Sequence, residues 1–121
     1  MLIYLGAFIV SVWGIAHLFP TKTIVKDFGN ISSGNKFIIT MEWITEGVAL
    51  IFIGFLIALV TYIDQNSPVA AAVYWSGFGV LNILSIVSLF TGFRHPFIVF
   101  KLCPLIFSGS SLLIIIGYFI K

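Results

Sequence analysis

Four stretches of the chain are almost entirely apolar, and each is long enough to cross a lipid bilayer as a helix. Spanning about 30 Å of hydrocarbon takes roughly 20 helical residues at about 1.5 Å each. The predicted spans are residues 2–19, 37–63, 69–90 and 96–120. Polar segments containing glycine or proline separate them.

Three connections join the spans. They are residues 21–36, 64–68 and 91–95. The first is long and polar, and Ser32 or Ser33 is placed to cap the helix that follows. The other two are tight turns, which make successive helices antiparallel. We therefore expect one domain, residues 1–121, that is all-α and folds as an integral membrane up-down four-helix bundle.

Composition points to the same class of protein. The chain is 60% hydrophobic and 8% charged, with a mean hydropathy of +1.19. Soluble domains carry about 25% charged residues. Such a chain cannot cover a water-facing surface, which excludes a soluble globular domain, a disordered chain and a nucleic-acid binder. Membrane lipid is the expected surrounding partner.

The distribution of bases predicts the orientation. Five bases lie on the side of the first and third connections, and only Lys121 lies on the other. The five are Lys22, Lys26, Lys36, Arg94 and Lys101. The positive-inside rule therefore places both termini outside the cytoplasm. Because the bases are spread over two loops and a tail, the sequence predicts no polybasic lipid site.

Ionisable groups within a span cost about 2.5–3.5 kcal/mol each, so they mark candidate sites. From the span midpoints, Glu46 lies ~5 Å and Asn82 ~3 Å from the middle of the membrane. His17 and Glu42 form a second layer toward the cytoplasm. Glu42 and Glu46 are four residues apart and share a helical face, with Trp43 beside them.

Each of these polar residues has a structural alternative. Asn82 could simply hydrogen-bond between helices, His17 could be an interfacial histidine, and Glu42 could reach the headgroups. Glu46 near the midplane must either stay protonated or pair, which favours a functional role. The predicted ligand-binding or proton-relay site is therefore Glu46, Glu42, His17, Asn82 and Trp43.

The sequence favours a protein that is not an enzyme. His17, Glu42 and Glu46 offer three metal ligands at best, so no metal site is predicted. The chain has no Ser–His or Cys–His spacing for nucleophilic catalysis, no glycine-rich phosphate loop, and no residue set that identifies a cofactor.

Several short motifs resemble a group of small uncharacterised bacterial four-span proteins, and more broadly the DoxX-like membrane proteins. They are His17-Leu-Phe-Pro-Thr21, Phe28-Gly-Asn-Ile-Ser32, Met41-Glu-Trp43, Glu46-Gly47 and Gly54. The resemblance implies a four-helix bundle in the bacterial inner membrane. DoxX-like proteins were first linked to terminal quinol oxidases and to redox or detoxification complexes. The resemblance carries over to Glu46 and His17.

Two functional hypotheses follow. The first is a binding protein or accessory subunit that holds a small amphipathic or lipid-like ligand in a cytoplasm-facing polar pocket around Glu46. The alternative is a proton-coupled transporter using Glu46, a homo-oligomer because four helices barely enclose a pathway. Residues Tyr74-Trp-Ser-Gly-Phe-Gly79 are similar to a stretch of the small multidrug resistance transporters. Those proteins carry their essential glutamate in the first span, where this chain has no acid.

Overall fold

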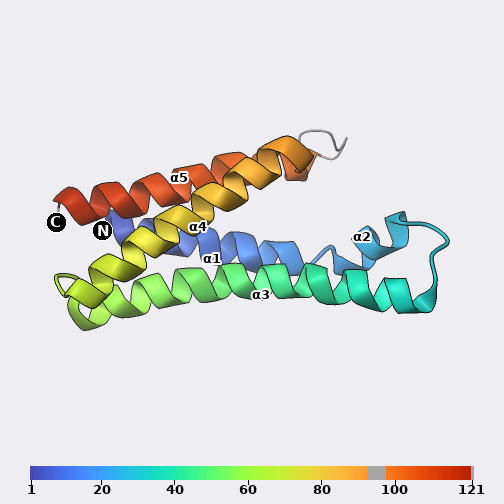
Figure 1. Ribbon diagram of the computed structural model, residues 1–121, viewed down its shortest axis with the longest axis horizontal. Coiled ribbons are helices and arrows are strands. Elements are labelled where there is room, and N and C mark those ends of the chain that lie inside the picture. Colours follow the sequence, from blue (N-terminus) through green and yellow to red (C-terminus); the bar gives the residue numbers. More distant parts are fainter. Residues whose placement is uncertain (93–97, 121) are drawn as a thin grey trace.

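The computed structural model describes residues 1–92 and 98–120, and each element in this part of the chain is a helix (Figure 1). In chain order they are α1 (Leu2–Leu18), α2 (Thr21–Asp27), α3 (Ser33–Asp64), α4 (Pro68–Gly92) and α5 (Ile98–Ile120). The all-α prediction is confirmed. Most of the turn predicted at residues 91–95 lies outside the described residues. Arg94, His95 and Lys121 also lie outside them.

The four long helices pack side by side. α1 contacts α3 and α5, and α4 contacts α5 and α3. Figure 1 shows that successive long helices run in opposite directions, so that the start of α1 and the end of α5 lie at the same end of the molecule. This arrangement is consistent with an up-down bundle.

The long first connection contains a helix that the sequence analysis did not predict. The chain bends by 55° between α1 and α2, at Phe19 and Pro20. Pro20 lacks an N–H and suits the start of a new helix better than the continuation of an old one. After this bend α2 packs against the first turns of α3. Figure 1 shows this part of α3 extending past the other long helices, with α2 beside it.

Side-chain caps fix the two described turns at the ends of α3. Ser32 Oγ accepts a hydrogen bond from the Asn35 backbone N–H at 3.1 Å, so the predicted N-cap of α3 is confirmed. Ser67 Oγ accepts one from the Ala70 N–H at 3.0 Å, and Pro68 is the first residue of α4. Both caps satisfy backbone donors that have no partner within the helix.

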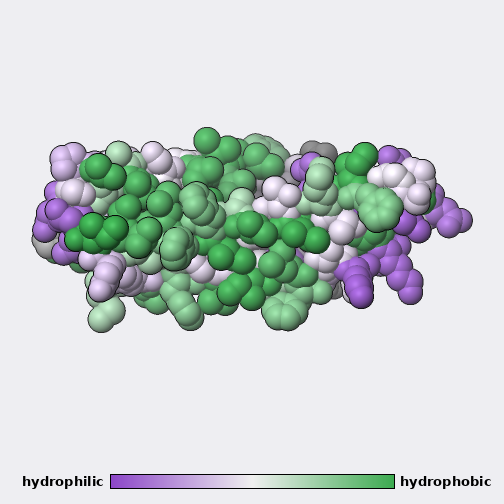
Figure 2. All heavy atoms as spheres, turned by 90° about the horizontal axis from the view of Figure 1, so that it is seen from below, coloured by the Kyte–Doolittle hydropathy of each residue, from purple (hydrophilic) through white to green (hydrophobic). Residues whose placement is uncertain are grey.

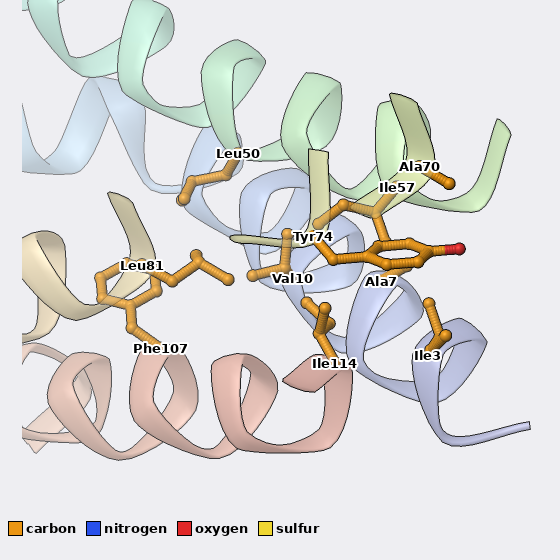
Figure 3. Packing of buried hydrophobic residues seen from close by; sticks show 10 residues of the cluster. All are labelled: Ile3, Ala7, Val10, Leu50, Ile57, Ala70, Tyr74, Leu81, Phe107 and Ile114. Atoms are coloured by element: carbon orange, nitrogen blue, oxygen red, sulfur yellow. The ribbon is translucent and has the colours of Figure 1, made fainter. Parts of the chain in front are cut away.

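A continuous apolar core joins the four long helices (Figure 3). Its residues, each no more than 2% exposed, are Ile3, Ala7, Val10, Leu50, Ile57, Ala70, Tyr74, Leu81, Phe107 and Ile114. Close approach of α1 to α3 depends on glycines. A Cβ on Gly14 would lie 2.8 Å from the Gly47 carbonyl oxygen, and a Cβ on Gly47 would lie 3.0 Å from that of Gly14.

The face of the molecule shown in Figure 2 is apolar along its middle and hydrophilic at its two ends. Phe8, Phe55 and Leu105, on three different helices, are 65%, 59% and 68% exposed. Three of the described helices are long and apolar enough to cross a membrane, and α1 together with α2 makes a fourth if the bent pair counts as one span.

Candidate functional site

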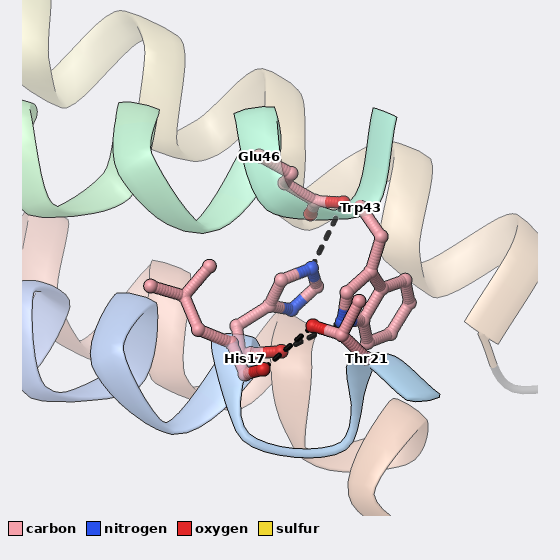
Figure 4. A network of polar contacts seen from close by, with 5 residues as sticks. His17, Thr21, Trp43 and Glu46 are labelled. Carbon is pink, nitrogen blue, oxygen red and sulfur yellow. Dashed lines mark hydrogen bonds and ion pairs between the residues drawn. The ribbon is translucent and has the colours of Figure 1, made fainter. Parts of the chain in front are cut away.

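The end of α1 is attached to α3 through Trp43 (Figure 4). The Trp43 indole N–H donates a hydrogen bond to the backbone carbonyl of His17 at 2.7 Å, and its ring stacks on the imidazole with the centroids 3.9 Å apart. The hydroxyl of Thr21 donates to the Leu18 carbonyl at 2.6 Å. The last four carbonyls of a helix have no partner within it. Trp43 and Thr21 therefore satisfy two of them where α1 ends.

His17 and Glu46 face each other at the centre of the site. Imidazole Nε2 lies 3.5 Å from Glu46 Oε2, across the space between α1 and α3. The His17 side chain is only 9% exposed, whereas that of Glu46 is 46% exposed. A separation of 3.5 Å is long for a hydrogen bond, and Nε2 makes no hydrogen bond within the described residues. The carboxylate thus keeps most of its hydrogen-bonding capacity for another molecule.

The pair lies toward one end of the bundle rather than at its middle. Its partner His17 is the last residue but one of α1. The depth predicted from the sequence assumes that residues 37–63 are centred in the membrane. However, α3 has 32 residues and is ~48 Å long, so its first turns extend past the end of α1. Glu46 therefore sits at the level where α1 ends.

A hollow of about 660 Å³ lies between α2 and α3 and borders Glu46. Three carboxylates from two helices line it, those of Asp27, Glu42 and Glu46. Aromatic rings of Phe28, Trp43 and Phe100 line it as well. Glu42 is exposed and lies one turn from Glu46, so the prediction that these two share a face holds.

A smaller hollow of about 200 Å³ lies on the α4 side of the same pair. His17, Trp43 and Glu46 line it together with the last turns of α4, from Leu84 to Thr91. Phe100 of α5 borders both hollows and meets the Trp43 ring edge-on, with centroids 5.8 Å apart. Trp43 and Glu46 thus stand between two spaces of different size.

The structure does not bring Asn82 to this site. Its side-chain amide donates to the Phe78 carbonyl at 2.7 Å and to the Ser111 hydroxyl at 3.2 Å, which ties α4 to α5. Ser85 and Ser108 form a second such link, 2.6 Å apart. The structural alternative for Asn82, a hydrogen bond between helices, is the geometry found. His17, Trp43 and Glu46 are brought together, with Glu42 at the edge.

Sequence reasoning missed three lining residues, Asp27, Phe28 and Phe100. Asp27 and Phe28 follow Ile24 by three and four residues, a helical spacing that was available in the sequence. It went unused because residues 21–36 were treated as a connection. Phe100 carries no distinguishing pattern in an apolar span. Among the described residues, no three His, Cys, Asp or Glu side chains are placed to hold a metal ion.

Comparisons with known proteins found no relative of this chain. No family model, no curated protein and no solved structure matches the chain. The resemblance to DoxX-like proteins stays a prediction.

Proposed function

We propose that the chain is an integral membrane protein of the bacterial inner membrane, an up-down four-helix bundle with both termini outside the cytoplasm. Its apolar belt between hydrophilic ends supports this (Figure 2). Side chains such as Phe8, Phe55 and Leu105 would be costly to expose to water, whereas acyl chains would cover them. The predicted excess of bases places α2 and the start of α3 at the cytoplasmic face.

Its proposed function is to bind a small amphipathic or lipid-like molecule at this cytoplasmic end. One observation carries the proposal: the half-exposed Glu46 carboxylate faces His17 at 3.5 Å and borders the 660 Å³ hollow. The volume is in the range of small-molecule sites, about 300–1,000 Å³. Polar groups at one wall and apolar side chains on the others suit a ligand with one polar end.

The lining also indicates which polar end fits. Three of the four acidic residues of the chain, Asp27, Glu42 and Glu46, line this hollow. Phe28, Trp43 and Phe100 present aromatic rings beside them. Carboxylates attract a positive charge, and aromatic faces add to that attraction. A cationic or hydrogen-bond-donating head group is therefore the best match.

The alternative, a proton-coupled transporter using Glu46, gains less from the geometry. A pathway through one chain would have to pass the level of Leu81, Phe107 and Ile114, which are 0%, 1% and 0% exposed. Transport would thus need a homo-oligomer in which a second copy completes the route. Binding needs only the hollow that one chain already forms.

The binding proposal can be tested with three amphiphiles that share a dodecyl tail: dodecyltrimethylammonium, dodecyl sulfate and dodecanol. The full chain in lipid nanodiscs is expected to bind the cation most tightly. Glu46→Gln removes the charge but keeps the shape. It should weaken that binding about tenfold, since opposite charges about 4 Å apart attract by about 1–4 kcal/mol between water and a partly buried site.

The matched control is Asp64→Asn, which makes the same change of charge at the last residue of α3, away from the hollow. It should bind the cation like the wild type. Equal affinity for all three amphiphiles, or the same loss in both variants, would exclude Glu46 as the ligand-binding group.

A further inference from the structure

Folding gathers three lysines that are scattered in the sequence. Lys22 and Lys26 of α2 and Lys36 of α3 line one groove of about 670 Å³, with Gly29 at its end. These are half of the six bases in the chain. The sequence analysis expected no polybasic lipid site because the bases are spread over two loops and a tail. The formation of α2 brings three of these bases to one groove.

Helical spacing separates the basic groove from the acidic hollow. Lys22 and Lys26 are four residues apart and share one face of α2, whereas Asp27 lines the acidic hollow on its other side. On α3, Lys36 lines the groove and Glu42 lines the hollow. The α2–α3 hairpin, residues 21–42, therefore carries a basic groove and an acidic, aromatic hollow.

The turn between the helices makes this arrangement possible. Gly29 has φ +74°, a left-handed conformation that a residue with a side chain rarely adopts. Its N–H donates to the Lys26 carbonyl at 3.0 Å and closes the end of α2. The chain can then fold back so that Lys36 reaches the side of the groove opposite Lys22 and Lys26.

No carboxylate neutralises the groove in the part of the chain that the structure describes. Its described lining contains no acidic residue, and no ion pair joins Lys22, Lys26 or Lys36 to a described Asp or Glu. Three ammonium groups around one space repel one another unless an anion lies between them. A phosphate group has the charge and the acceptor oxygens to fill that role.

We propose that this groove binds the phosphate-bearing head group of an anionic phospholipid. Large apolar side chains flank it in the chain: Phe19 precedes Lys22 and is 85% exposed, and Phe37 follows Lys36 and is 75% exposed. A soluble phosphate compound has no apolar part that could cover these side chains, whereas the acyl chains of a lipid can cover them. The proposal rests on the membrane location proposed above but not on ligand binding at Glu46.

The test measures lipid affinity of the purified full chain in mild detergent, using phosphatidylglycerol and phosphatidylcholine with identical acyl chains. Each lysine near a head group contributes about 1 kcal/mol, or about fivefold in affinity. Phosphatidylglycerol should therefore bind more than tenfold better than phosphatidylcholine. Lys26→Gln should lower that preference about fivefold, and the triple Lys22→Gln, Lys26→Gln, Lys36→Gln variant should abolish it.

Lys101→Gln is the control, because Lys101 is exposed on α5 and does not line the groove. It should keep the preference. Equal binding of the two lipids, or equal losses in Lys26→Gln and Lys101→Gln, would overturn the proposal.

Glycerol 3-phosphate distinguishes the two sources of phosphate: it should compete only weakly, and competition as strong as that of the lipid would assign the groove to a soluble phosphate compound. Membrane insertion is checked separately by alkaline extraction of membranes, so a failure of the proposed location would be recognised.

Discussion

Trp43 caps the end of α1 and covers its last-turn histidine at the same time. Its indole N–H donates to the His17 carbonyl at 2.7 Å, while its ring lies almost parallel to the imidazole, at an interplanar angle of 16°. One side chain of α3 thereby fixes both the backbone and the ring of His17. Because Glu46 is three residues further along the same helix, the His17–Glu46 distance depends on this attachment.

Replacing Trp43 with phenylalanine is expected to remove the hydrogen bond while leaving an aromatic ring against His17. The free energy of unfolding should fall by about 1 kcal/mol, since the freed carbonyl at the end of α1 has no partner within its helix. Equilibrium unfolding in mixed micelles titrated with dodecyl sulfate measures the change. Trp75→Phe is the control, because Trp75 is 48% exposed and its ring contacts, with Phe78 of α4 and with two aromatic rings of α5, remain possible for phenylalanine. Equal losses in both variants would show that the hydrogen bond contributes nothing.

The contact between α1 and α3 is expected to be sensitive to a methyl group at Gly54. A Cβ there would collide with the Ser11 hydroxyl and lie 2.5 Å from the Ala7 carbonyl oxygen. Since backbone cannot move aside as a flexible side chain can, Gly54→Ala should destabilise the protein by about 1–3 kcal/mol. Gly79→Ala meets nothing within 4 Å and should be neutral or slightly stabilising. The measurement is the thermal unfolding midpoint of each variant, which should be lower for Gly54→Ala than for Gly79→Ala. Similar midpoints would contradict the close packing of α1 against α3.

Asn82 is expected to contribute to stability and not to ligand binding. Its amide links α4 to the Ser111 hydroxyl of α5, and such links in membrane proteins contribute about 0.6 kcal/mol on average. Asn82→Ala should therefore lower the free energy of unfolding by roughly that amount or somewhat more, since it also leaves a small cavity. Its affinity for dodecyltrimethylammonium should equal that of the wild type. If the variant is stable but no longer binds dodecyltrimethylammonium, Asn82 takes part in ligand binding.

The four long helices could be predicted because apolar runs set their lengths and because Ser32 and Pro68 mark the starts of α3 and α4. Rotation of each helix about its own axis was harder to predict. Helices such as α1 are apolar on all sides, so no polar face indicates which side turns inward. Glu42 and Glu46 could be paired because both lie on one helix. The direction of Asn82 depended on how α4 packs against α5, which no pattern in the sequence reveals.

The position of Glu46 along the bundle was hard to predict for a related reason. An apolar run gives the length of a helix but not how much of it lies beside its neighbours. α3 continues past α1 because α2 covers part of its first turns, and α2 was hidden in a polar segment of only seven helical residues. The same omission hid the basic groove and the contribution of Asp27 and Phe28 to the acidic hollow.

The last prediction concerns orientation across the membrane. Alkaline phosphatase, which is active only outside the cytoplasm, should be active when fused after Lys121 or inserted at Asn66. A green fluorescent protein inserted at Asn30 should fluoresce, because the α2–α3 hairpin should lie in the cytoplasm. The reverse pattern would overturn both the topology and the lipid-facing position of the basic groove.

A lysine variant sharpens this test. Changing Lys22, Lys26 and Lys36 to glutamine reduces the predicted base count on the cytoplasmic side from five to two, against one on the other side. Since orientation follows the bias in bases near the spans, this variant should insert in both directions and give activity with both reporters at the Lys121 fusion. Changing Lys101 alone leaves four bases against one and should not alter the topology. If the triple variant keeps a single orientation, the lysines serve the groove rather than the topology, and their concentration on the α2–α3 hairpin has to be explained by binding alone.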